Sequence, residues 1–142
     1  MRIKRSEIVT HSPGETKKLA KELASSLNPP KIIGLFGELG AGKTTFVQGF
    51  AEYFGIKAVR SPSFTLINEY KNYSVKIYHV DLYRIEDAGE LYPAGFFDLI
   101  RERDAFILVE WPEKIRDVVK FDVLVYIFHL DELSRKIKIQ FT

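Results

Sequence analysis

The sequence feature that most constrains the fold is the stretch GELGAGKT at residues 37–44. It fits the pattern G-x-x-x-x-G-K-[ST] of a phosphate-binding loop, or P-loop. The apolar segment KIIGLFG precedes it and is typical of a strand buried on both faces. The stretch that follows carries Phe46, Phe50 and Phe54 at helical spacing, so we expect a helix from Gly42 to Phe54. A strand, a glycine-rich loop and a helix in this order predict an α/β fold.

Each residue type in the loop suits phosphate chemistry. Glycines let backbone N–H groups turn toward phosphate oxygens, Lys43 can reach the β- and γ-phosphates, and the Thr44 hydroxyl can bind Mg²⁺. Thr45 either helps to position the loop or the metal, or lies on the helix surface. The loop therefore predicts binding of the phosphates of a nucleotide together with Mg²⁺. The residues predicted to bind the nucleotide from this stretch are Gly37, Glu38, Leu39, Gly40, Ala41, Gly42, Lys43, Thr44 and Thr45.

Before the loop, the sequence predicts one amphipathic helix. Ser12 is the expected N-cap, with Pro13 at the first helical position and Glu15 closing a capping box. Leucines at positions 19, 23 and 27 share one helical face, and Asn28-Pro29-Pro30 ends the helix.

After the loop, the chain is rich in strand-forming residues. Two strands with a hairpin turn at Lys71-Asn72 are expected in residues 63–84, and short helices and turns in residues 87–104. Three further strands are expected in AFILVEW, FDVLVYIFHL and SRKIKIQFT, with a helical linker after Pro112 and a turn near Asp131-Glu132. We therefore expect a single domain over residues 1–142, a P-loop NTPase-like three-layer sandwich with a mostly parallel central sheet and some antiparallel strands.

Composition narrows the classes of function. The 142 residues are 46% hydrophobic and 13% aromatic, enough to bury a core, and the absence of cysteine excludes disulfides, thiolate metal sites and cysteine nucleophiles. The 21 basic and 19 acidic side chains nearly cancel, so net charge decides nothing about RNA binding. No apolar run has the length of a signal peptide or a membrane span, which favours a cytoplasmic protein without a membrane partner.

A P-loop also requires a carboxylate at a neighbouring strand end for the metal, and a group that orients the nucleophile. Glu110 follows the apolar run FILV, as in a Walker B motif, although Asp is commoner there. Asp81 ends the strand-like run VKIYHVD. The alternatives are a surface acid for Glu110 and an N-cap or loop acid for Asp81, but a nucleotide site requires more than one acid and these two follow strand ends.

Two other sets of polar residues allow more than one role. The hydroxyl-rich segment SPSFT, residues 61–65, is either a switch loop that senses the γ-phosphate or an ordinary turn. His11, His79 and His129 are too scattered for a metal-ligand spacing, so solvated or packing roles are favoured for each.

Four motifs occur together in this order: GELGAGKTTF, SPSFTLINEY, YHVDLYRI and LVEWPEK. The combination resembles the TsaE (formerly YjeE) family of bacterial P-loop ATPases, and the resemblance covers essentially the whole chain. It implies an ATPase of tRNA threonylcarbamoyladenosine biosynthesis that acts with the partner proteins TsaB and TsaD, and with tRNA only indirectly through their complex. It further implies that ATP hydrolysis resets this complex between turnovers.

The resemblance also implies roles for single residues. Lys43 and the loop amides would hold phosphates, Thr44 and Glu110 would serve Mg²⁺, and Asp81 would be needed for hydrolysis. Trp111 would lie beside the nucleotide, and the stretch from Thr10 to Thr16 would approach the adenine. The commoner family sequence SPTYTL becomes SPSFTL here, so Phe64 lacks the phenol of the family tyrosine.

Three other functions can use a phosphate loop. A P-loop small-molecule kinase would need an acceptor domain and an arginine-rich lid, for which Arg101 and Arg103 are the nearest candidates. A GTPase would need Asn-Lys-x-Asp, which does not occur. A nucleotide-dependent assembly factor would dock without essential hydrolysis. No arginine is evidently placed as a finger in cis, so hydrolysis by the isolated protein should be slow.

Overall fold

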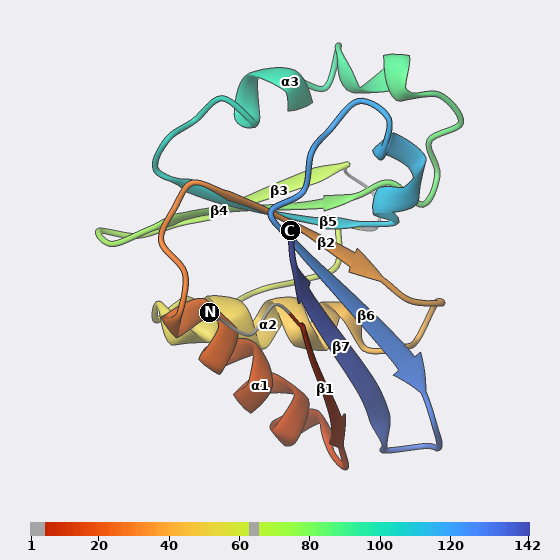
Figure 1. Ribbon diagram of the computed structural model, residues 1–142. Coiled ribbons are helices and arrows are strands. Elements are labelled where there is room, and N and C mark those ends of the chain that lie inside the picture. Colours follow the sequence, from red (N-terminus) through yellow and green to blue (C-terminus); the bar gives the residue numbers. More distant parts are fainter. Residues whose placement is uncertain (1–4, 63–65) are drawn as a thin grey trace.

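The computed structural model describes residues 5–62 and 66–142. One seven-stranded sheet in the order β1-β7-β6-β2-β5-β4-β3 forms its centre, and α1 and α2 lie together on one face of it (Figure 1). The strands are β1 (Arg5–Thr10), β2 (Lys31–Phe36), β3 (Ile67–Lys71), β4 (Lys76–Asp81), β5 (Ala105–Glu110), β6 (Val123–His129) and β7 (Arg135–Phe141). The helices are α1 (Pro13–Ser25), α2 (Lys43–Tyr53) and α3 (Phe96–Leu99), with 3₁₀ turns η1 (Ala88–Leu91) and η2 (Pro112–Ile115).

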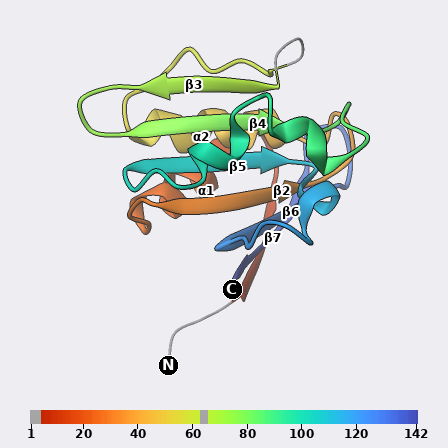
Figure 2. The ribbon, with the colours of Figure 1, turned by 90° about the horizontal axis from the view of Figure 1, so that it is seen from above.

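The central strands of the sheet pair in parallel, and the strands on its two sides pair antiparallel. β2 pairs in parallel with β5 and β6, and β4 pairs in parallel with β5, whereas β3, β7 and β1 join their neighbours antiparallel. Figure 2 shows β3, β4, β5 and β2 side by side in this order. The predicted fold class is thereby confirmed. The carboxyl ends of the four parallel strands, β2, β4, β5 and β6, all lie at the same end of the sheet, which we call the carboxyl edge.

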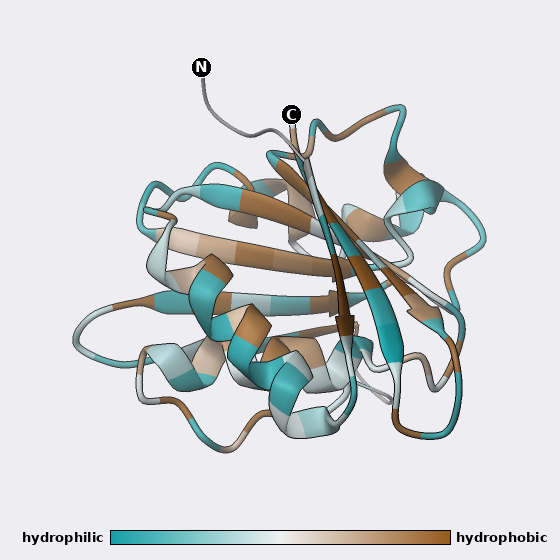
Figure 3. Ribbon diagram, turned by 60° about the horizontal axis from the view of Figure 1, so that its bottom comes forward, coloured by the Kyte–Doolittle hydropathy of each residue, from teal (hydrophilic) through white to brown (hydrophobic). Residues whose placement is uncertain are grey.

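Burial is greatest along β5, in which all six residues are buried. This apolar strand separates two clusters. One cluster joins the sheet to α1 and α2, and the other joins it to the segments between β4 and β6, including η1, α3 and η2. Figure 3 shows the apolar colouring along the central strands and the hydrophilic stripe on α1. The sheet is thus covered by two long helices on one face and by short helical turns on the other.

The first helix begins where the sequence predicts. The Ser12 hydroxyl accepts a hydrogen bond from the Glu15 N–H at 3.1 Å, but the Glu15 carboxylate accepts from the His11 N–H at 2.8 Å. The capping box is therefore shifted, since its return bond reaches the residue before the N-cap.

No helix in residues 5–62 or 66–142 is long and apolar enough to cross a membrane.

The hairpin and the short helices are also confirmed. β3 and β4 pair antiparallel, and the Asn72 carboxamide oxygen accepts hydrogen bonds from the N–H groups of Ser74 and Val75 in the turn. Residues 87–104 contain η1 and α3 among turns. The linker after Pro112 is less helical than expected, because only the four-residue turn η2 forms there.

The strand β1 was missed by the sequence analysis. It pairs antiparallel with β7 at the margin of the sheet, and Ile8 and Val9 remain 40% and 45% exposed. A margin strand that buries so little apolar surface carries only a weak alternating pattern, which explains the omission.

The two long helices approach each other closely at Gly49 in α2. A Cβ atom at this position would lie 2.5 Å from the Lys17 Cα and 2.6 Å from the Lys17 carbonyl oxygen, both on the backbone of α1. A backbone cannot yield as a side chain does, so this contact requires glycine. The close approach sets how α2, and the phosphate loop before it, lies against the sheet.

We predict that Gly49→Ala lowers the free energy of unfolding by about 1–3 kcal/mol, because the added methyl group forces the helices apart. Urea unfolding followed by circular dichroism measures the change. Gly14→Ala is the matched control, since a Cβ in that α1 position meets only the Ser12 hydroxyl oxygen at 3.7 Å. The control should be neutral or stabilise by up to about 1 kcal/mol, and equal effects of the two substitutions would contradict the close-contact account.

Candidate functional site

The phosphate loop joins the end of β2 to the start of α2. Gly40 and Gly42 have φ angles of 77° and 109°, in the left-handed region that favours glycine. A Cβ on Gly37 would lie 3.0 Å from the Ile127 carbonyl oxygen of β6. The loop glycines thus permit both the turn and the close packing of the loop against the sheet. α2 begins at Lys43, so its partly positive N-terminus faces the loop.

Lys43 is the cation at the centre of the site. It is only 4% exposed, its Nζ donates a hydrogen bond to the Gly37 carbonyl, and this Nζ lies 4.0 Å from the centre of the Trp111 ring. Burial lowers the pKa of Lys43, and the negative charges of Glu110 and Asp81 oppose that effect. The ammonium group is thus held in the loop between an aromatic ring and two acids.

The structure brings the two predicted acids together. Parallel pairing of β4 with β5 sets Asp81 opposite Glu110 at the carboxyl edge. Glu110 is 5% exposed, and the Asp81 Oδ1 accepts a hydrogen bond from the Tyr83 N–H at 3.0 Å. Burial raises the pKa of Asp81, with a further contribution from the Glu110 charge, while the Tyr83 hydrogen bond acts in the opposite direction. Neither acid is a surface residue without neighbours.

A third residue of this group, His79, was not identified from the sequence. It is fully buried, as a packing role requires, but its Nε2 also lies 2.6 Å from the Glu110 Oε2. An ionised carboxylate only accepts hydrogen bonds, so the imidazole donates here. The other two histidines, His11 and His129, are exposed. The available signal was spacing: His79 precedes Asp81 by two residues on one strand, so both side chains face the same side of the sheet.

A cavity of about 310 Å³ opens where these groups meet. Its lining combines the second half of the loop with both acids and one residue of the SPSFT segment. The lining residues are Leu39, Gly40, Gly42, Lys43, Thr44, Thr45, Ser61, Asp81 and Glu110. Residues 63–65 of SPSFT lie outside the described residues, and these include Phe64, which differs from the commoner family tyrosine. This cavity is the candidate phosphate and metal site.

The other predicted nucleotide-binding residues line a neighbouring cavity. Gly37, Glu38, Ala41 and Trp111 border this second space of about 410 Å³, together with Leu39, which lines both cavities. The ends of β2 and β6 supply much of the remaining wall. The predicted set is therefore divided between the two sides of the loop.

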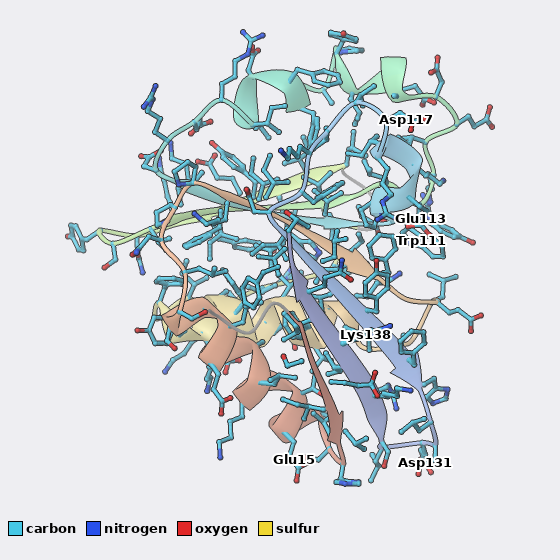
Figure 4. All side chains as sticks on the ribbon, in the orientation of Figure 1. Glu15, Trp111, Glu113, Asp117, Asp131 and Lys138 are labelled. Atoms are coloured by element: carbon cyan, nitrogen blue, oxygen red, sulfur yellow. The ribbon has the colours of Figure 1, made fainter. Side chains whose placement is uncertain are left out.

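Trp111 adopts a backbone conformation that is costly for a bulky residue. Its φ and ψ angles are 62° and 47°, and it is the one residue other than glycine with a positive φ among those described. Such strain costs on the order of 1–3 kcal/mol. Its ring contacts Tyr83, at 5.2 Å between ring centres, as well as the Lys43 ammonium. Figure 4 shows Trp111 and Glu113 together at the carboxyl edge.

The predicted N-terminal stretch also reaches the loop. Pro13 and Thr16 line a small cavity of about 40 Å³ with Gly42 and Thr45 of the loop and α2. The Thr16 hydroxyl is held by the Thr10 hydroxyl at 2.8 Å, and both residues are 2% exposed. Thr45 lines this space as well as the phosphate cavity, so its side chain lies on the loop side of α2 rather than on the outer helix surface.

Comparison with known proteins shows which family the chain resembles. The family model described as "Threonylcarbamoyl adenosine biosynthesis protein TsaE" matches residues 10–137. The tRNA threonylcarbamoyladenosine biosynthesis protein TsaE of Aquifex aeolicus is 40% identical over 136 residues, 94% of each chain. The protein of the same name from Bacillus subtilis is 43% identical over 109 residues, which are 76% of this chain and 67% of that protein.

A solved structure shows that the similarity extends to the fold. The crystal structure of Bacillus subtilis YdiB superposes with a TM-score of 0.80 at 31% sequence identity, covering 99% of this chain and 88% of that chain. The family match spans the loop, both acids and Trp111. The curated relatives that are 40% and 43% identical cover most of the sequence. The chain belongs to the TsaE family.

Proposed function

We propose that this protein binds and hydrolyses ATP with Mg²⁺, as a component of tRNA threonylcarbamoyladenosine biosynthesis that acts with TsaB and TsaD. The observation that carries the proposal is the meeting of Lys43, Asp81 and Glu110 around one cavity at the phosphate loop. A cation, a helix N-terminus and two carboxylates are the groups that phosphoryl transfer to water requires. The role of the relatives in this biosynthesis supports the assignment to the pathway.

The side chains around the cavity suit Mg²⁺. No cluster of three or more His, Cys, Asp or Glu residues that could hold a metal occurs in residues 5–62 and 66–142. Mg²⁺ does not need such a cluster, since it is usually held by one or two carboxylates, water and the substrate phosphates. The Thr44 hydroxyl and the Glu110 carboxylate would hold the ion, which supplies neutralisation of the phosphate charge.

Hydrolysis also requires a water molecule placed in line with the γ-phosphate. Asp81 is suited to orient it, because its carboxylate borders the cavity and its Oδ1 is fixed by the Tyr83 N–H. Lys43 would stabilise charge on the phosphates, and its burial strengthens that interaction. Glu110 cannot turn freely, since His79 holds one of its oxygens. The two acids thus have different roles: Asp81 orients the water, and Glu110 holds the metal.

The small-molecule kinase is disfavoured by the fold. Its lid candidates Arg101 and Arg103 are exposed and precede β5, whereas Glu110 ends that strand. A six-residue strand spans about 20 Å, so these arginines lie toward the end of the sheet that is opposite to the carboxyl edge. The assembly factor without hydrolysis remains the second candidate, because a nucleotide-dependent dock could use the same phosphate loop.

A steady-state assay tests the proposed function. Phosphate release from ATP should be slow for the protein alone and should rise when TsaB and TsaD are added. The same samples are analysed for phosphorylated metabolites supplied as acceptors. Stoichiometric phosphorylation of a metabolite would replace the proposal with a kinase, and an absence of stimulation by TsaB and TsaD would remove the partner assignment.

We predict that Asp81→Ala separates binding from turnover. The Kd for ATP, measured through the single tryptophan Trp111 beside Lys43, should change by less than about threefold. Partner-stimulated kcat should fall by about 100-fold or more, as for the loss of a group that acts on the nucleophile. Cells that carry only this variant should lose the tRNA modification. Modification that persists without hydrolysis would establish the assembly factor instead.

We predict that His79 controls the metal side of the site through Glu110. His79→Leu leaves a buried carboxylate without its donor, which should cost about 1–3 kcal/mol of stability and raise the Mg²⁺ concentration needed for ATP binding. His79→Gln is the control, because its side-chain amide can still donate to Glu110. Nucleotide binding in EDTA should be nearly the same for both variants. Equal Mg²⁺ requirements in the two variants would show that His79 has only a packing role.

We predict that Asp81→Asn stabilises the free protein in a pH-dependent manner. Because burial raises the pKa of Asp81, the folded state holds the Asp81 proton more tightly than the unfolded chain, and stability is lost as pH rises from the ordinary value of 3.8 through the raised one. The Asn variant avoids this loss. Its urea midpoint should therefore exceed that of the wild type at pH 7.5, and the gain should shrink as pH falls toward 4.

The opposite sign is expected at Asp131, which provides a control. Hydrogen bonds from the Ser134 and Leu133 N–H groups lower the pKa of this exposed acid, so its ionised form stabilises the fold above pH 3.8. Asp131→Asn should lower the urea midpoint at pH 7.5. A gain for Asp81→Asn that does not vary with pH would refute the electrostatic explanation.

A further inference from the structure

Arg135, the first residue of β7, reaches the phosphate loop from a distant part of the chain. Its Nε donates a hydrogen bond of 2.7 Å to the Ala41 carbonyl, 94 residues away, and its Nη2 lies 3.5 Å from the Gly40 carbonyl. These two carbonyls belong to the most strongly turned part of the loop, between Gly40 and Gly42. The loop is therefore held from outside by a side chain that is not part of its motif.

The rest of the Arg135 guanidinium is also occupied by the main chain. Its Nη1 donates to the carbonyls of Asp131 and Ser134 at 2.9 Å each, and to that of Glu132 at 3.3 Å. In the described part of the chain it forms no ion pair with a carboxylate. Carbonyls do not neutralise a guanidinium, which stays charged at every ordinary pH. A full positive charge is thus fixed next to the loop.

The hydrogen bond to Ala41 also determines where a loop amide points. In a planar trans peptide the carbonyl and the following N–H face opposite ways. When the Ala41 carbonyl faces Arg135, the Gly42 N–H must face away from it. Arg135 lines the small 40 Å³ cavity, and Gly42 lies between that cavity and the phosphate cavity, which it also lines. The hydrogen bond from Arg135 to the Ala41 carbonyl therefore favours the orientation in which the Gly42 N–H can contact a phosphate.

The β6–β7 turn that carries Arg135 is itself well held. The Asp131 carboxylate accepts from the Leu133 and Ser134 N–H groups, and the Ser134 hydroxyl lies 3.4 Å from the His11 Nδ1. Figure 4 shows Asp131 of this turn and Glu15 of α1 at the same end of the molecule. Arg135 thus projects from a fixed base, as a residue that restrains another segment must.

We propose that Arg135 is a positioning residue of the nucleotide site. It holds the Gly40–Gly42 segment in the phosphate-binding conformation before a ligand arrives, and its unneutralised charge attracts the polyphosphate of a nucleoside di- or triphosphate. The left-handed glycines would otherwise give the loop many conformations, so a preset loop loses less entropy on binding. This inference rests on the proposed function only in taking a nucleotide as the ligand.

The test compares the wild type with Arg135→Gln and Arg135→Lys. The Kd for ADP is measured by Trp111 fluorescence, with Mg²⁺ and again in EDTA, and urea unfolding confirms that each variant is folded. Arg135→Gln should weaken ADP binding by about tenfold or more under both conditions, as expected when charge-assisted hydrogen bonds are lost. Arg135→Lys should fall between the two, because it restores the charge but not the fork of donors.

Kinetics and hydrogen exchange separate positioning from general damage. Partner-stimulated hydrolysis by Arg135→Gln should show a raised KM for ATP with kcat at saturation within about threefold of the wild type. In the free protein the loop amides around Gly42 should exchange faster, while the amides of β5 should not. A fall in kcat with unchanged KM would overturn the proposal.

Lys31→Gln is the matched control, because it removes a positive charge that also donates hydrogen bonds to main-chain carbonyls. Its Nζ donates to the Asn28 carbonyl at 3.2 Å and to the Pro30 carbonyl at 3.3 Å, at the start of β2, whereas the phosphate loop follows the end of that strand. The proposal is overturned if this control weakens ADP binding as much as Arg135→Gln does, or if Arg135→Gln binds ADP within twofold of the wild type. A wild type that fails to bind ADP would instead refute the proposed function, so the two failures are distinguishable.

Discussion

The parallel pairing of β5 with its two neighbours is the constraint on which the site depends. β5 is buried along its whole length, so its register cannot shift without exposing apolar residues or burying polar ones. With the register fixed, Asp81 lies opposite Glu110 on one side, and β2 leads into the phosphate loop on the other. The hydrophobic burial that stabilises the sheet therefore also sets the positions of the charges.

The same arrangement works against stability at the carboxyl edge. Lys43 and Glu110 are nearly buried, and Asp81 is half-buried beside another acid. Trp111 adds backbone strain immediately after Glu110. A protein selected only for stability would not collect these features in one place. Together they indicate that the edge is kept ready for a ligand that supplies the missing compensation, as an anionic phosphate with its metal would.

Local patterns explain why much of the fold could be predicted. The strand before the loop, the helix after it and the capped helix α1 are each encoded within a few consecutive residues, so periodicity and capping chemistry identify them. The two acids could be proposed from the sequence because each ends a strand-like run. β1 could not, because its pairing with β7 depends on a distant segment and buries little.

The sequence did not reveal the contacts of His79 and Arg135, and the physical reason is the same for both. Each acts through a contact set by strand pairing: His79 reaches Glu110 across β4 and β5, and Arg135 reaches Ala41 from the β6–β7 turn. Motif patterns describe residues near one another in sequence, whereas these supports come from 31 and 94 residues away. A lone histidine or arginine gives no sign of such a partner before the sheet is assembled.

These two supports bear on different halves of the site, and this division follows from the sheet. His79 lies on the β4 side and restrains an acid, while Arg135 lies on the β7 side and restrains the loop. No described contact joins His79 and Arg135 directly, so the loop and the acids have separate supports. Within the protein, Lys43 connects the two halves through its charge and its contact with Trp111, and a ligand that spans both would connect them further. A nucleotide phosphate with its metal would be that ligand, since it must contact the loop amides and the carboxylates at once. The slow hydrolysis expected of the isolated protein is consistent with a site whose two halves are preset by separate supports and are joined within the protein chiefly by the charge of Lys43.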